Sequence, residues 1–216
     1  MDIDLSQTSK TYFYNLSKYD KILQNRNKLL KDNLNREVLK QTISIWNEQL
    51  AQVGAKIIFA RLNFVSHLDK LAHIAHANLT DNKEDLQLSY SGLQGENVDQ
   101  IYRQLFELLE QSIEKDLHLG YTSVGPHRDD IKIVCNDIDI RNFGSQGQQR
   151  TTALSLKLAE LNLIKEESGE SAILLLDDVM SELDATRQEF LIKSLSDIQL
   201  FITTTEITDA LTEVIE

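Results

Sequence analysis

The chain has 216 residues, of which 41% are hydrophobic and 26% are charged, and its formal net charge is −12. This composition is ordinary for a globular protein in water, and the length allows one large domain or two small ones. A nucleic-acid-binding domain usually presents a basic face. The acidic balance therefore argues against DNA binding by this chain alone, although it leaves a local basic patch open.

Neither a membrane span nor an exported protein is indicated. No stretch approaches the roughly 18 apolar residues that a spanning helix needs, and the opening MDIDLSQTSK lacks the apolar core of a signal peptide. Cys135 is the single cysteine, which excludes an internal disulfide framework. These features predict a cytoplasmic protein with no membrane partner, in which Cys135 packs as a small apolar residue on a strand.

The first part of the chain has the pattern of long helices. Residues 12–31 and 36–78 contain few glycines and no proline. In the second of these segments apolar side chains recur close to the about 3.6-residue period of a helix. They are Val38, Ile45, Ala51, Ile58, Leu62, Val65 and Leu68.

A polar segment and a further helix follow. Within residues 80–96, the alternation of Leu86, Leu88 and Tyr90 with polar residues predicts a short strand. Residues 98–117 return to a helical pattern. The first predicted domain is therefore a mostly α lobe over residues 1–117 with one short strand.

Residues 118–216 form the second predicted domain, in which strands and helices alternate as in an α/β fold. The predicted elements are a hairpin over 131–140 that turns at Asn136 and Asp137, helices over 148–167 and 182–195, and strands over 172–176 and 199–203. The run over 172–176 is continuously apolar, which predicts a strand buried on both faces of a largely parallel sheet.

Paired carboxylates end the first of these strands, at Asp177 and Asp178. Open α/β sheets bind ligands at the carboxyl ends of their strands. Adjacent strand residues point to opposite faces, so the two carboxylates are expected to do different work. One can hold Mg²⁺ through water, and the other can orient or deprotonate an attacking water. The alternative is a strand that ends in solvated acids or in a helix cap.

A glycine-rich turn precedes the helix predicted from Gln148. Gly144 and Gly147 permit backbone conformations that other residues avoid, and Ser145 offers a hydroxyl. The free N–H groups and the positive dipole end of a helix form a site that suits phosphate. The alternative is a serine and glycine cap without a ligand.

The sequence lacks a phosphate-cradling loop of the form G-x-x-x-x-G-K-[ST]. The nearest match runs from Gly120 to Gly125, but Pro126 and His127 follow where Lys and Ser or Thr are required. Pro also removes a backbone N–H that such a loop would use. The chain therefore contains the elements of half a nucleotide site.

In combination these motifs resemble the ATP-binding-cassette superfamily. GSQGQQR resembles the signature motif usually written LSGGQQR, ILLLDD resembles Walker B, and SELD resembles the D-loop. The segments GPHRDD, RNFGSQGQQRTTALSLKLAE and YNLSKYDKILQNRNKLLK are similar to the RecF family, over essentially the whole chain. The resemblance implies the C-terminal part of an α/β ABC-type ATPase head with a long-helix, mostly α lobe.

Site roles follow from that resemblance. Ser145 and Gly147 would contact the γ-phosphate of ATP held by a partner subunit, and Gln148 would start the signature helix. Asp177 would hold the Mg²⁺ shell through water, and Asp178 would occupy the catalytic carboxylate position. Asp184 would belong to the D-loop at a dimer seam and contribute to ATP binding.

The resemblance also implies a function for a longer protein. RecF proteins are ATPases that dimerise around two ATP molecules, act with RecO and RecR at gapped or single-stranded DNA, and help to load recombinase. It implies roles in DNA repair, recombination and replication and in the SOS response. The family begins with a Walker A lobe that these residues do not contain, so we expect a truncated gene or partial chain without ATPase activity alone. No DNA-contacting residue is assigned.

Two other functions are consistent with parts of the sequence. An ABC-transporter ATPase subunit would share the signature, but the long helices, the second Asp of Walker B and Thr203 to Glu206 in place of a switch His argue against it. A non-catalytic helical interaction module would suit a chain without the phosphate loop. His127 is assigned a structural role. The i, i+3 pair His73 and His76 is judged too small a ligand set for a metal.

Overall fold

The computed structural model describes residues 1–32, 36–169, 173–180, 184–195 and 199–204. The chain divides into two compact units. One contains Met1–Ser66 and Ser89–Lys132, and the other contains His67–Leu88 and Ile133–Glu216. Among the described residues, every helix is too short or too polar to cross a membrane.

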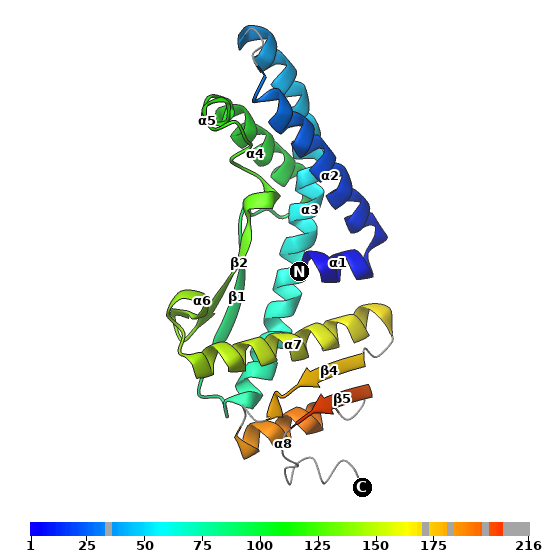
Figure 1. The fold of residues 1–216 in the computed structure, drawn as a ribbon, viewed down its shortest axis with the longest axis vertical. Helices are drawn as coiled ribbons and strands as arrows, with labels where there is room; N and C mark the ends of the chain where they lie inside the picture. The colour runs from blue at the N-terminus through cyan, green and yellow to red at the C-terminus, as the bar shows by residue number, and fades with distance from the viewer. Residues whose placement is uncertain (33–35, 170–172, 181–183, 196–198, 205–216) are drawn as a thin grey trace. The chain divides into compact units, whose positions relative to one another are not determined.

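The first unit is built on long helices, which Figure 1 shows in blue to green. They are α1 (Asp2–Thr8), α2 (Lys10–Leu29), the first part of α3 (Arg36–Leu79), α4 (Val98–Gln111) and α5 (Ile113–Leu119), followed by the 3-10 turn η1 (Pro126–Arg128). The long helix predicted over 36–78 is confirmed. The segment 98–117 was predicted as one helix but is two, because the backbone turns at Ser112.

The buried stripe of α3 differs in part from the predicted one. Ala51, Ile58 and Val65 are buried as expected. Val38 and Ile45 are 53% and 59% exposed, which the prediction had wrong. The buried positions there belong to a neighbouring row that comprises Ile43, Leu50 and Ile57.

A buried ion pair and a hydrogen bond from the same arginine connect three helices of this unit. Arg26 on α2 donates from Nη1 to Asp116 Oδ2 on α5 at 2.8 Å and from Nε to Asn47 Oδ1 on α3 at 2.6 Å. Arg26 and Asp116 are both fully buried. Asp116 also accepts bonds from the Ser112 hydroxyl and the Ser123 amide. Because a buried charge is costly unless it is paired, this network fixes how α2, α3 and α5 pack.

The second unit contains the end of α3 and the predicted α/β elements. A three-stranded sheet has the order β1 (Leu86–Ser91), β2 (Asp130–Cys135), β3 (Ile138–Asp139). Of its first two strands, residues 86–88 and 133–135 belong to this unit. The hairpin between β2 and β3 turns at Asn136 and Asp137, whose φ values of 47° and 65° are those of a tight hairpin turn. Ile140 was predicted to extend β3 but begins α6 (Ile140–Phe143), because the Asp139 side chain caps that helix.

The remaining elements form a βαβ-like layer, drawn in yellow to red in Figure 1. They are α7 (Gln146–Ser168), β4 (Ile173–Asp177), α8 (Ala185–Ser194) and β5 (Gln199–Thr203). β4 and β5 pair in parallel with Ile173 opposite Gln199 and Asp177 opposite Thr203, so the two strands end together.

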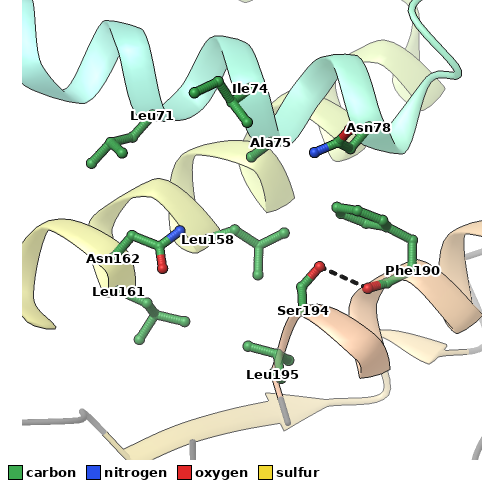
Figure 2. Close-up of a pocket in the computed structure, with 10 residues that line it drawn as sticks. All are labelled: Leu71, Ile74, Ala75, Asn78, Leu158, Leu161, Asn162, Phe190, Ser194 and Leu195. Carbon is green, nitrogen blue, oxygen red and sulfur yellow. Dashed lines mark hydrogen bonds between the residues drawn. The ribbon is translucent and has the colours of Figure 1, made fainter. Parts of the chain in front are cut away.

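The core of this unit lies between α3, α7, α8 and the inner face of the strands. It contains Ala75, Leu79, Leu154, Leu158, Leu161, Leu176, Met180, Leu191, Ile192 and Leu195. Beside it lies a mainly apolar cavity of about 140 Å³, whose lining comes from α3, α7 and α8 (Figure 2). Ser194 donates its hydroxyl to the Phe190 carbonyl at 2.8 Å, and Asn78 and Asn162 are the other polar residues of the lining.

The prediction that β4 is buried on both faces is wrong for the described residues. Leu176 is buried against the core, whereas Ile173 and Leu175 are 61% and 73% exposed. Phe201 on β5 is 53% exposed. One face of the strand pair therefore packs against the core, and the other presents apolar side chains outward.

Candidate nucleotide-binding site

Ser145 begins α7 through a reciprocal cap. Its Oγ accepts a hydrogen bond from the Gln148 amide at 3.2 Å, and its own amide donates to Gln148 Oε1 at 3.1 Å. The helix therefore begins at Gln146 rather than at the predicted Gln148, and Gly147 lies inside its first turn. The exposed N-terminus of a long helix places partial positive charge here, as the phosphate prediction requires.

The two glycines of this turn serve different purposes, and neither has the positive φ that the sequence suggested. At Gly144 an added Cβ would lie 2.6 Å from the Ile140 carbonyl oxygen, so close backbone approach requires glycine. At Gly147 an added Cβ would meet nothing within 4 Å. Glycine costs about 1 kcal/mol in a helix relative to alanine. No contact among the described residues requires glycine at position 147.

Asp177 and Asp178 lie together at the carboxyl end of β4, as predicted. The Thr203 hydroxyl at the end of β5 donates to Asp177 Oδ1 at 2.5 Å. The Asp178 amide donates to the Thr203 carbonyl and hydroxyl oxygens, each at 3.1 Å. Thr203 therefore positions both residues. It can do so because the two parallel strands end together, with Asp177 opposite Thr203. The sequence alone did not reveal this contact.

Asp178 does not belong to the strand. β4 ends at Asp177, and Asp178 has a φ of 52°, in the left-handed region that residues with a Cβ adopt rarely. The prediction that both aspartates lie on the strand is therefore wrong for Asp178. The chain turns between the two residues, so strand alternation does not describe their relation.

Asp184 caps α8, and its side chain accepts a bond from the Arg187 amide at 3.0 Å. Both residues line a polar cavity of about 300 Å³, together with Thr80, Lys83 and Glu84. Residues 181–183 of the SELD motif lie outside the described residues. The structure thus brings the two aspartates together at one strand end and places Ser145 and Asp184 at the N-termini of two helices.

The GPHRDD segment, in which the sequence predicted a structural role for His127, lies within the first unit. His127 Nε2 lies 3.1 Å from the Thr122 carbonyl, so Nε2 donates and Nδ1 accepts from the Tyr19 hydroxyl at 2.9 Å. Arg61 donates to the Pro126 carbonyl, and Tyr90 donates to Asp129 at 2.5 Å. These contacts agree with the structural role expected for His127.

Comparison with known proteins places these motifs in a family. No family model matches the chain. A DNA replication and repair protein RecF from Alkaliphilus oremlandii is 47% identical over 209 residues, and its counterpart from Limosilactobacillus reuteri is 42% identical over 221 residues. The matches cover 95% and 100% of this chain. By sequence, the chain belongs to the RecF family.

This RecF-family chain spans 56% to 59% of the length of those two relatives. A solved structure of the recombination mediator protein RecF with ATP, from the RecFOR pathway, superposes with a TM-score of 0.86 at 40% identity. The superposition covers 96% of this chain and 56% of that one. The fold is therefore that of part of an ABC-type ATPase head with a long-helix lobe, as the sequence predicted.

Proposed function

We propose that this chain supplies the signature and Walker B half of a composite ATP site in a RecF-like repair protein. The observation that carries the proposal is the first turn of α7. Ser145 and Gly147 present an exposed helix N-terminus, and the fold does not itself require the glycine. A nucleotide held by a partner subunit would place its γ-phosphate there, against free N–H groups and the helix dipole.

The two aspartates at the end of β4 would have separate roles, one in Mg²⁺ binding and one in hydrolysis. When bound, Mg²⁺ neutralises charge on the β- and γ-phosphates. Asp177, whose Oδ1 already accepts from Thr203, would hold that ion's water shell through its remaining lone pairs. Asp178, which follows the strand in a left-handed backbone conformation, would orient or deprotonate the attacking water. Asp184 would contribute to ATP binding at the dimer seam.

The biological role proposed follows the relatives. They are DNA replication and repair proteins, and the solved structures belong to the RecFOR pathway. We therefore propose a cytoplasmic, ATP-dependent homodimer that binds gapped or single-stranded DNA, works with RecO-type and RecR-type partners, and helps to load recombinase. DNA contacts would lie outside the acidic bulk of this chain, whose net charge is −12. A transporter ATPase is disfavoured, because relatives at 42% to 47% identity are repair proteins.

The test uses a chimera in which the phosphate-loop portion of the Alkaliphilus oremlandii relative precedes this chain. Ser145→Arg places a bulky side chain where the partner's nucleotide is expected. The substitution should leave ATP binding largely intact and abolish ATP-dependent dimerisation, read by light scattering with and without ATP. Ser66→Arg, on the exposed surface of α3, is the matched control and should dimerise normally. An undiminished ATP-induced dimer in Ser145→Arg would count against a role in trans.

A further inference from the structure

A cluster of three possible metal ligands, none of them among the residues assigned to the nucleotide site, lies in the second unit. His76 comes from α3, Glu84 from the segment before β1, and Cys135 from the end of β2. His76 Nε2 lies 3.1 Å from Glu84 Oε2, and Cys135 Sγ lies 3.7 Å from His76 Nε2 and 3.8 Å from Glu84 Oε2. Sequence inspection paired His76 with His73 and could not see Cys135, which is 59 residues away.

The hydrogen bonds around His76 fix which of its nitrogens carries a proton. The Ser155 hydroxyl donates to the Thr151 carbonyl at 2.8 Å, so its oxygen accepts from His76 Nδ1 at 2.9 Å. In the neutral ring Nε2 then has only a lone pair to offer. That lone pair faces a carboxylate oxygen at 3.1 Å, and the ring is fully buried, which disfavours an imidazolium.

Two lone pairs that face each other at hydrogen-bond distance need either a shared proton or a metal ion between them. The distances suit a metal ion. Zinc bonds of about 2.3 Å to sulfur and about 2.0–2.2 Å to nitrogen or oxygen give tetrahedral ligand separations of about 3.3–3.7 Å. The three observed separations, 3.1, 3.7 and 3.8 Å, lie close to that range.

We propose that His76 Nε2, Glu84 Oε2 and the Cys135 thiolate bind a zinc-class divalent cation, with a fourth position open to water. The thiol proton leaves on binding, as metal–thiolate bonds require. The ligand set excludes Mg²⁺, which takes oxygen ligands, so this site is distinct from the one at Asp177. Glu84 also lines the polar cavity of about 300 Å³, which gives the ion a path to solvent.

The surroundings of the cluster have the form of an outer ligand shell. Ser155 on α7 holds the His76 ring in the metal-binding tautomer. Gln148, in the first turn of α7, lies 3.4 Å from the second oxygen of Glu84 through its Nε2. A bound ion would therefore brace the start of α7, the helix on which the nucleotide proposal rests, although the metal site does not depend on that proposal.

Cobalt(II) is the probe, because a cobalt–thiolate bond gives a near-ultraviolet charge-transfer band and Cys135 is the single cysteine of the chain. The 216-residue chain, reduced and freed of metal, is titrated with cobalt and then with zinc. We expect one equivalent of cobalt, a thiolate band, and displacement by zinc with a rise in Tm. Ser155→Ala should weaken cobalt binding about 10–100-fold, and His76→Gln or Glu84→Gln should weaken it further.

Two variants separate the site from chance binding. Cys135→Ser should abolish the band while far-ultraviolet circular dichroism stays native. His73→Gln, one turn away on the exposed side of α3, should bind as the parent does. Absence of a thiolate band in the folded parent would overturn the proposal and leave a shared proton between His76 and Glu84. Cobalt binding that His73→Gln abolishes, or that His76→Gln and Glu84→Gln leave unchanged, would overturn it as well.

Discussion

At the scale of residues, substitutions of the two aspartates at the end of β4 should impair different steps of the reaction. In the chimera that contains a phosphate loop, Asp177→Ala should weaken Mg²⁺-nucleotide binding, since it removes the carboxylate that Thr203 positions. Asp178→Asn should bind nucleotide normally and hydrolyse it about 10²–10⁴-fold more slowly, the usual cost of losing a general base. Nucleotide affinity and single-turnover hydrolysis are measured for both. Wild-type hydrolysis by Asp178→Asn together with normal binding by Asp177→Ala would contradict the assignment.

The motif residues were predictable from sequence because their spacing is specific, but their local geometry was not. Asp178 was expected on a strand, and it occupies a left-handed turn because the chain leaves the sheet one residue earlier. Thr203 was noted only as the replacement for a switch His. Its contact with Asp177 depends on the register of two parallel strands, which a single sequence does not specify. Cys135, His76 and Glu84 converge through tertiary packing, which leaves no local signal.

At the scale of elements, Gly147→Ala should separate folding from function. Alanine in the first turn of α7 meets nothing within 4 Å and should stabilise the chain by about 0.4–1 kcal/mol, measured by urea unfolding. The same change in the chimera should reduce ATP-dependent dimerisation, because the added methyl occupies the surface proposed for the partner's nucleotide. Gly169→Ala is the matched control. It also meets open space, but its φ of 72° makes the substitution destabilising.

The buried network between α2, α3 and α5 predicts a large stability effect. Asp116→Asn leaves Arg26 buried without its counter-charge and should lower the free energy of unfolding by about 3–5 kcal/mol. Equilibrium urea unfolding measures the change. Asp20→Asn removes an exposed carboxylate of α2 and should change the stability by less than about 0.5 kcal/mol. Similar changes in the free energy of unfolding for the two variants would show that the ion pair does not stabilise the packing of these helices.

Long periodic elements were predicted well, whereas their ends and partners were not. The helix over 36–78 and the strand over 199–203 are confirmed almost to the residue, since each has a clear period or a clear apolar run. The break at Ser112 and the early end of β3 arise from side-chain caps and local turns. The predicted division at residues 117 and 118 remains a prediction.

At the scale of the whole molecule, the chain alone should not turn over ATP. A phosphate loop supplies the Lys and backbone N–H groups that bind the β- and γ-phosphates, and these 216 residues contain no such motif. Steady-state phosphate release by purified chain should equal that of Asp178→Asn at the same concentration. Turnover above background that this substitution abolishes would show that the chain forms a complete site by another route.

The outward face of β4 and β5 affects how the chain can be handled. Ile173, Leu175 and Phe201 stand on adjacent parallel strands and are more than half exposed. Apolar side chains clustered on paired strands attract one another between molecules, and added salt of the sulfate type strengthens that attraction. Light scattering from concentrated chain would then report clustering through this face as well as through any nucleotide. Every dimerisation measurement therefore needs a dilution series without ATP as its baseline.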